Sequence, residues 1–332
     1  MTSTSRSSSS DRPGTLVPVP EAVLGQAAAR GEVIAMIDGG TGREVPYAEL
    51  EMAVGQLTAG FAGAGVVKGD AVCLFAPNHP AYAPVFYAVS RIGAVLAPIG
   101  AQATVAELVS HLARNNVHLM VAAEGLLQVA GTAERNLGAG VSPLKEILTL
   151  HPNDARRSIV DLFGSPAPAP DVAIDAAADT AVITRRVSQG GGVQTVRLTH
   201  ADVARGLDVL ADALPLAVGE KVLAQAPWSE SGETELLLHH SLASGATTVV
   251  PDGSDPEPLL EAIERYGIET ALLSPATLAE LAAAAPTAGA DLSSLRRVVC
   301  CGPAAEDSAG RAATLGTATV STLAALVALS EA

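Results

Sequence analysis

Residues 179–200, DTAVITRRVSQGGGVQTVRLTH, decide the fold. A run rich in β-branched residues stops at Gly190, Gly191 and Gly192 and resumes before a helical pattern. Glycine reaches positive φ without strain, so successive N–H groups in such a loop can converge on an anion. Thr199 and Asp202 then have the spacing of a helix capping box. The stretch predicts a strand, a glycine loop, a second strand and a capped helix.

The composition indicates a folded, acidic protein. Hydrophobic residues make up 48% of the 332 residues and charged residues 17%, which is typical of a globular chain with one large domain or two closely packed ones. The formal net charge is −15. Nucleic acids and anionic membranes are bound through basic patches, so we expect neither as a partner.

The cysteines and the two ends of the chain indicate in which cellular compartment the protein is expected. Cys73, Cys300 and Cys301 form no disulfide framework, which favours a reducing cytoplasm. Residues 1–17 are rich in serine and lack the apolar segment of a signal peptide, so they predict a disordered tail. The uncharged stretch 312–330 approaches the length of a membrane span, but its glycine, serine and threonine favour a buried strand followed by a helix.

The glycine loop closes with residues 198–200, LTH, and there resembles the phosphate loop of the adenylate-forming superfamily. That superfamily includes acyl- and aryl-CoA synthetases such as 4-coumarate–CoA ligase. Further matching phrases are residues 47–50 (YAEL), 68–74 (KGDAVCL), 77–80 (PNHP), 244–250 (SGATTVV) and 295–303 (LRRVVCCGP). The resemblance runs from about residue 33 to residue 305.

The resemblance implies an α/β fold with two packed, parallel-rich sheet subdomains flanked by helices, like the N-terminal domain of these enzymes without the C-terminal domain. We expect a first subdomain at residues 18–165 and a second, with the phosphate loop, at residues 171–332. A proline-rich linker at residues 166–170 would join them.

Two departures from the family pattern concern ATP. The lysine of the family's loop falls on Gln194, and a neutral amide cannot offer a phosphate the charge of an ammonium group. The glutamate that helps to hold magnesium would fall within residues 321–327, STLAALV, which contain no carboxylate. The hinge and the C-terminal domain with the adenylating lysine are not matched. We therefore expect a truncated chain that does not adenylate and that holds neither ATP nor magnesium as a cofactor.

The resemblance also implies positions for a ligand. The family's ligand-binding positions would fall on Trp228, where its carboxylic-acid pocket begins, on Ser231, Gly232 and Ser274, and on Gly302 and Pro303, in the turn beside the adenine. Its degenerate phosphate loop would comprise Gly190, Gly191, Gly192, Gln194, Thr199 and His200. Two interpretations of the loop stay open: an anion nest near Arg185, Arg186, Arg197 and His200, or a flexible remnant, which we favour because a bare glycine triplet is a weak signal.

Three residues are candidates for catalysis: Glu230, His239 and Cys301. Glu230 stands where the family has a pocket histidine, and Glu235 lies one helical turn before His239, a spacing that suits an acid–base pair. The alternative is a solvated helix face, which we favour because charged residues usually stay exposed. Cys301 is either a nucleophilic thiol or a buried packing residue, and we favour the second. No spacing of metal ligands stands out.

The function predicted from the sequence is binding of an acyl or aryl small molecule, either free, as a thioester or linked to a carrier protein. The chain would act as an auxiliary protein in a biosynthetic pathway. One alternative is an isomerase, cyclase or hydrolase that uses the old acid pocket without ATP. Another is a ligase completed in trans by a partner enzyme. A homo-oligomer is left open, because a second subunit could cover an apolar sheet edge.

Overall fold

The computed structural model describes residues 17–138, 143–166, 168–187, 193–301, 315 and 319–322. The predicted serine-rich tail, apart from residue 17, lies outside these residues. So do Gly190, Gly191, Gly192, Gly302 and Pro303, and most of the uncharged stretch near the C-terminus.

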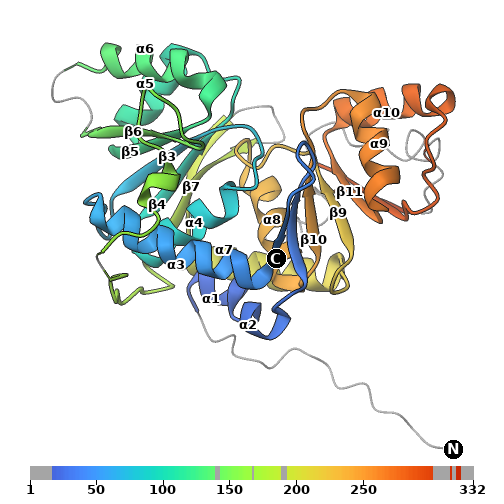
Figure 1. Cartoon of the computed structure of the whole chain (residues 1–332), viewed down its shortest axis with the longest axis horizontal. Helices are drawn as coiled ribbons and strands as arrows, with labels where there is room; N and C mark the ends of the chain where they lie inside the picture. The colour runs from blue at the N-terminus through green and yellow to red at the C-terminus, as the bar shows by residue number, and fades with distance from the viewer. Residues whose placement is uncertain are drawn as a thin grey trace, which may run out of the picture.

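Two parallel-rich sheets form the framework (Figure 1). The six-stranded sheet has the order β6-β5-β3-β4-β7-β8, and all its pairs are parallel except the hairpin β7–β8. Its strands are β3 (Ala71–Phe75), β4 (Val95–Ile99), β5 (Val117–Ala122), β6 (Glu146–Thr149), β7 (Thr180–Val187) and β8 (Val193–Thr199). The architecture expected from the sequence is therefore present in this half.

The seven-stranded sheet has the order β13-β12-β11-β9-β10-β1-β2, and only the hairpin β1–β2 is antiparallel. Its strands are β1 (Ile34–Asp38), β2 (Glu44–Pro46), β9 (Lys221–Ala224), β10 (Thr247–Val250), β11 (Thr270–Leu273), β12 (Arg297–Cys300) and β13 (Thr319–Thr322). The four residues of β10 and of β11 are completely buried, as in strands covered on both faces.

The division expected at residues 166–170 does not separate the two sheets. The hairpin β1–β2 precedes that linker but joins the seven-stranded sheet, where β1 pairs with β10. The hairpin β7–β8 follows the linker but joins the six-stranded sheet through β4. Sequence position missed this exchange because it follows from pairing between strands that lie far apart in the chain.

The helices cover both sheets (Figure 1). α9 (Pro256–Tyr266) and α10 (Pro275–Ala288) pack on the outer face of the seven-stranded sheet, and α5 (Val105–Arg114) and α6 (Leu127–Asn136) on the outer face of the other. The remaining helices are α1 (Val19–Leu24), α2 (Ala27–Arg30), α3 (Tyr47–Gly63), α4 (Tyr82–Arg91), α7 (His200–Ala213) and α8 (Gly232–Ser244), with short 3-10 helices at Glu124–Leu126 and Ile159–Leu162. Among the described helices, none is long and apolar enough to cross a membrane.

The largest hydrophobic cluster joins the two sheets. It contains Met36 of β1, Leu74 of β3 and Leu238 of α8, all almost completely buried. The capping box predicted at the start of α7 is confirmed: Thr199 N donates to Asp202 Oδ2 at 2.8 Å, and Asp202 N donates to Thr199 Oγ1 at 3.1 Å. The helix after the glycine-loop hairpin is therefore fixed at its first residue.

Candidate ligand site between the two sheets

The turn that follows β9 brings several predicted pocket residues together. It ends at Ser231, which caps α8 by accepting a hydrogen bond from Thr234 N at 3.2 Å. The Thr234 hydroxyl donates to the carbonyl of Pro227 at 2.6 Å, which closes the turn on itself. The Ser231 hydroxyl is thus used for helix capping.

Ser274 lies beside this turn. Its backbone N–H donates to the side-chain oxygen of Gln225 at 3.1 Å, and its hydroxyl accepts from Thr277 N at 3.1 Å as the cap of α10. The turn after β9 and the start of α10 are therefore joined. The hydroxyl of Ser274, like that of Ser231, serves a helix cap.

Gly232 allows α8 to approach the hairpin β7–β8. A Cβ atom at this position would lie 3.0 Å from Thr184 Cγ2 and 3.3 Å from Leu198 Cδ1. The Thr184 hydroxyl is buried there, and among the described residues it has no hydrogen-bond partner. Glycine is consequently the residue type that lets the helix start against the hairpin that carries the glycine loop.

Trp228 forms an interior wall. It is 1% exposed, and its ring meets the Tyr82 ring edge-on, with 5.3 Å between ring centroids. Of the two interpretations, core or pocket wall, the burial favours core packing in this conformation. Two residues later, Glu230 is exposed, and its Cγ would lie 3.8 Å from a Cβ added at Gly100, just after β4 of the other sheet.

The predicted solvated face of α8 is wrong for Glu235 and His239, because both are buried between α8 and α4. Glu235 is 2% exposed and accepts a hydrogen bond of 2.8 Å from the Tyr82 hydroxyl. Burial raises the pKa of Glu235 to about 8, against the lowering effect of that bond. The carboxyl group is therefore protonated near neutral pH.

The same burial shifts the pKa of His239 in the opposite direction. It is 1% exposed and shares a hydrogen bond of 2.8 Å with the Tyr87 hydroxyl through Nδ1. Burial lowers its pKa to about 3, so the ring is neutral. Burial thus keeps Glu235 and His239 neutral, and each bonds a different tyrosine of α4.

Tyr82 and Tyr87 were not among the residues predicted for the site. The available signal was rarity, because the chain has only four tyrosines, and two of them fall five residues apart before a buried strand. Buried tyrosine hydroxyls need polar partners, and α8 supplies them.

Cys301 lies just after β12 and is 5% exposed. Burial, with a smaller effect of Cys300, raises the pKa of its thiol well above the usual range. Its Sγ contacts the carbonyl oxygen of Val299 at 3.6 Å. These properties oppose a nucleophilic thiolate and favour the packing role. The three proposed catalytic residues therefore occupy an exposed turn, a helix interior and a strand end.

The described part of the phosphate-loop region contains few groups suited to ATP. Gln194 is exposed on β8, where the resemblance would place the lysine. His200 is buried, accepts a hydrogen bond of 3.1 Å from Val19 N at Nδ1, and has its pKa lowered to about 4 by burial. Its Nδ1 is therefore turned toward α1. Among the hairpin side chains whose exposure the structure describes, Arg185 and Arg197 are the exposed cations. At the position of the family's lysine, the described donor is therefore a neutral amide.

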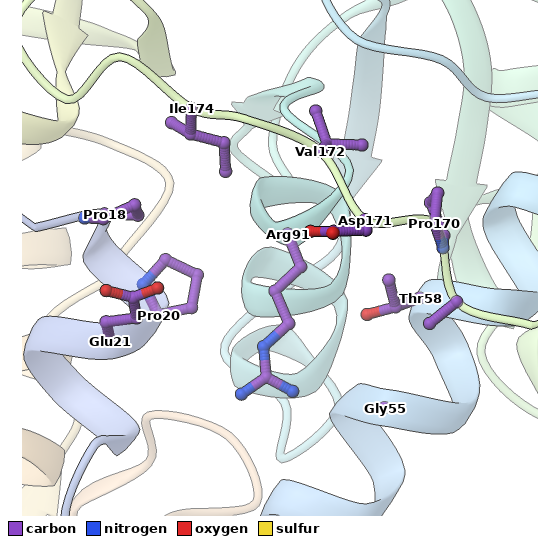
Figure 2. A pocket seen from close by; sticks show the side chains of 11 residues that line it. Pro18, Pro20, Glu21, Gly55, Thr58, Arg91, Pro170, Asp171, Val172 and Ile174 are labelled. Atoms are coloured by element: carbon purple, nitrogen blue, oxygen red, sulfur yellow. The ribbon is translucent and has the colours of Figure 1, made fainter.

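A separate pocket of about 390 Å³ lies between α1, α3, the end of α4 and residues 169–174 (Figure 2). Arg91 projects into it from α4, and its guanidinium pairs with Glu51 at 2.6 Å. The Thr58 hydroxyl in its wall donates to the Val54 carbonyl at 2.7 Å. None of its lining residues belongs to the predicted acid pocket.

Comparisons with known proteins agree with this architecture. The family described as AMP-binding enzyme matches residues 24–322. The chain is 26% identical over 291 residues to 4-coumarate–CoA ligase 5 of Oryza sativa subsp. japonica, covering 85% of this chain and 52% of the relative. It is 28% identical over 276 residues to feruloyl-CoA synthase of an Amycolatopsis species, covering 81% of this chain and 52% of the relative. The chain thus spans about half the length of either relative.

Among solved structures, the N-terminal domain of FACL13 from Mycobacterium tuberculosis superimposes with a TM-score of 0.79. The identity is 18%, and the match covers 92% of this chain and 75% of that structure. The two-sheet fold is therefore that of an N-terminal domain of this kind, as the sequence resemblance implied.

Proposed function

Because the chain belongs to the AMP-binding enzyme family, with an acyl- and aryl-CoA ligase-like fold, we propose that it binds an aryl or acyl carboxylic acid without adenylating it. The names of two relatives suggest 4-coumarate and ferulate as first ligands. The ligand is taken free, as a thioester or on a carrier protein. The chain then serves as an auxiliary protein in a biosynthetic pathway.

The proposed loss of adenylation is supported mainly by Gln194, which stands where the family has a lysine. It is exposed on β8, so it is available to a ligand, but its amide is neutral. Transfer chemistry at phosphates depends on positioned cations that neutralise developing charge. With Gln194 in the lysine's position, we propose no reaction of the ligand with ATP.

The site supports retention of a ligand. The turn after β9, the cap of α10 and the start of α8 meet at the carboxyl ends of strands from both sheets. Ligands of open α/β sheets bind at this end of the strands. The ATP-independent enzyme alternative has less support, since Glu230, His239 and Cys301 do not form one constellation.

Calorimetry with the purified chain tests the proposal. We expect saturable binding of 4-coumarate, ferulate or a CoA thioester of either, and no heat with ATP and magnesium. Gln194→Lys should create measurable ATP binding, whereas Thr195→Lys, which adds the same charge at the next exposed position, should not. Micromolar ATP binding to the unaltered chain would overturn the proposal and favour a ligase completed by a partner. Silence toward every acid and thioester would remove the ligand assignment.

A further inference from the structure

Asn78 joins the two sheets at the candidate site with one side chain. It lies three residues after β3 of the six-stranded sheet. Its Nδ2 donates to the carbonyl of Ala224 at 3.0 Å and to that of Ala226 at 2.9 Å. Its Oδ1 accepts from the backbone N–H of Trp228 at 2.9 Å. Ala224 is the last residue of β9 in the seven-stranded sheet, and Ala226 and Trp228 lie in the turn that follows it.

The chemistry of these bonds selects a primary amide. Two donors and one acceptor at the end of one methylene group are needed, and among the natural side chains only asparagine offers them at this length. Aspartate would place oxygens against two carbonyl oxygens. Alanine would leave both carbonyls and one N–H without this partner, at a half-buried position where unmade hydrogen bonds are costly.

The turn after β9 is also held by hydrogen bonds to β11 of the seven-stranded sheet. The backbone N–H groups of Gln225 and Ala226 donate to the carbonyl of Leu272 at 3.1 and 2.9 Å, and the Gln225 side chain accepts from Ser274 N. The turn is thus fixed between β11 and the loop after β3. Beyond it, the exposed Glu230 lies beside Gly100, which follows β4 of the other sheet.

We propose that Asn78 is the positioning residue of the ligand site. By clamping residues 224–228 to the loop after β3, it sets how far the two sheets stand apart where the ligand enters, and so sets ligand affinity. The effect on a ligand rests on the proposed function; the clamp itself does not. The role goes beyond general stability because the ladder bonds of β9 and the capping bond of α8 do not involve Asn78, so both elements should form without the amide.

Trp228 provides the readout, because it is the only tryptophan and its N–H is bonded to the clamp. We expect Asn78→Ala to shift its emission to longer wavelength and to raise its quenching by acrylamide. Asn153→Ala is the matched control. Asn153, in the loop after β6, also makes hydrogen bonds through both ends of its amide, to Thr149 Oγ1 and to the N–H groups of Ala155 and Arg156, and none of these bonds reaches residues 224–228.

Ligand binding is measured on the same variants with 4-coumarate and ferulate as probes. Asn78→Ala and Asn78→Asp should each weaken binding by about tenfold, the loss typical of removed hydrogen bonds, while Asn153→Ala keeps the affinity of the unaltered chain. A folded Asn78→Ala variant with unchanged affinity and unchanged quenching would overturn the inference and leave the proposed function standing.

Hydrogen exchange of the Trp228 amide in the unaltered chain covers the case in which the Asn78 variants do not fold. We expect this amide to be protected, and exchange at the solvent rate would contradict the clamp. If the unaltered chain binds neither probe, the proposed function fails, and the quenching and exchange results still decide whether Asn78 holds the turn.

Discussion

Replacing Glu235 with glutamine should change how the stability of the fold depends on pH. The folded-state pKa of Glu235 is raised from 4.5 to about 8, mainly by burial. A raised carboxyl pKa means that the folded state holds a proton that the unfolded state releases. The stabilising contribution of this group is therefore complete below pH 4.5 and is lost as the pH rises toward 8. At about 1.4 kcal/mol per pH unit, this interval corresponds to about 5 kcal/mol as an upper limit.

His239 acts in the opposite direction over a lower range. Its pKa falls from 6.5 to about 3 on burial, so its contribution is present above pH 6.5 and is lost as the pH falls toward 3. The two slopes cancel between pH 4.5 and 6.5. Above pH 6.5 only the loss from Glu235 remains, about 2 kcal/mol by pH 8. The groups facing the pair across α4 are the Tyr82 and Tyr87 hydroxyls, whose pKa values are raised by burial.

Urea unfolding followed by Trp228 fluorescence measures this effect at a series of pH values. Glu235→Gln keeps the shape of the side chain and an acceptor for Tyr82, so we expect the variant to lose the decline between pH 6.5 and 8 that the unaltered chain shows. Glu261→Gln, at an exposed position on α9, should leave the decline in place. Parallel stability curves for the unaltered chain and Glu235→Gln across this range would refute the reasoning.

Three further predictions concern packing and capping. Gly60→Ala should lower the free energy of unfolding by about 1–3 kcal/mol, because the added Cβ would lie 2.5 Å from the Leu162 carbonyl oxygen. Gly55→Ala on the same helix meets nothing within 4 Å and should raise the free energy of unfolding by about 0.5–1 kcal/mol. Equal denaturation midpoints for the two variants would contradict this. Thr199→Ala should cost about 1 kcal/mol through loss of the α7 cap, and an unchanged urea midpoint would count against that cap. Cys301 should react with a thiol reagent only as fast as the chain opens, and stoichiometric labelling of the folded chain within seconds would show that its burial is misjudged.

Local sequence patterns predicted the hairpin β7–β8 and the helix after it. They did not predict which sheet the hairpin joins, because that depends on pairing between distant strands. The interrupted β-branched run gave the hairpin β7–β8, and Thr199 with Asp202 gave the start of α7. Neither pattern carries information on which sheet the hairpin joins. That is decided by contact with β4, more than 80 residues earlier in the chain.

The resemblance named elements of the candidate site, but not the burial of its titratable residues. It named the turn after β9 and Ser274, which one hydrogen bond joins. The burial of Glu235 and His239 was missed because charged residues are usually exposed. The apolar residues 236–238, LLL, show that α8 has no wide polar face, and this was the signal against a solvated helix. The clamp by Asn78 leaves no periodic signature in the sequence.

The exchange of hairpins between the sheets affects how the chain emerges from the ribosome. β1 pairs with β10 on one side and with β2 on the other, yet β10 is synthesised roughly 200 residues after β1. At ordinary synthesis rates, the edge of β1 that pairs with β10 stays unpaired for roughly 10–40 s. During that interval the hairpin β1–β2 presents an apolar strand edge to the cell. Chaperone binding to nascent chains should consequently centre on this hairpin and end once β10 has been released.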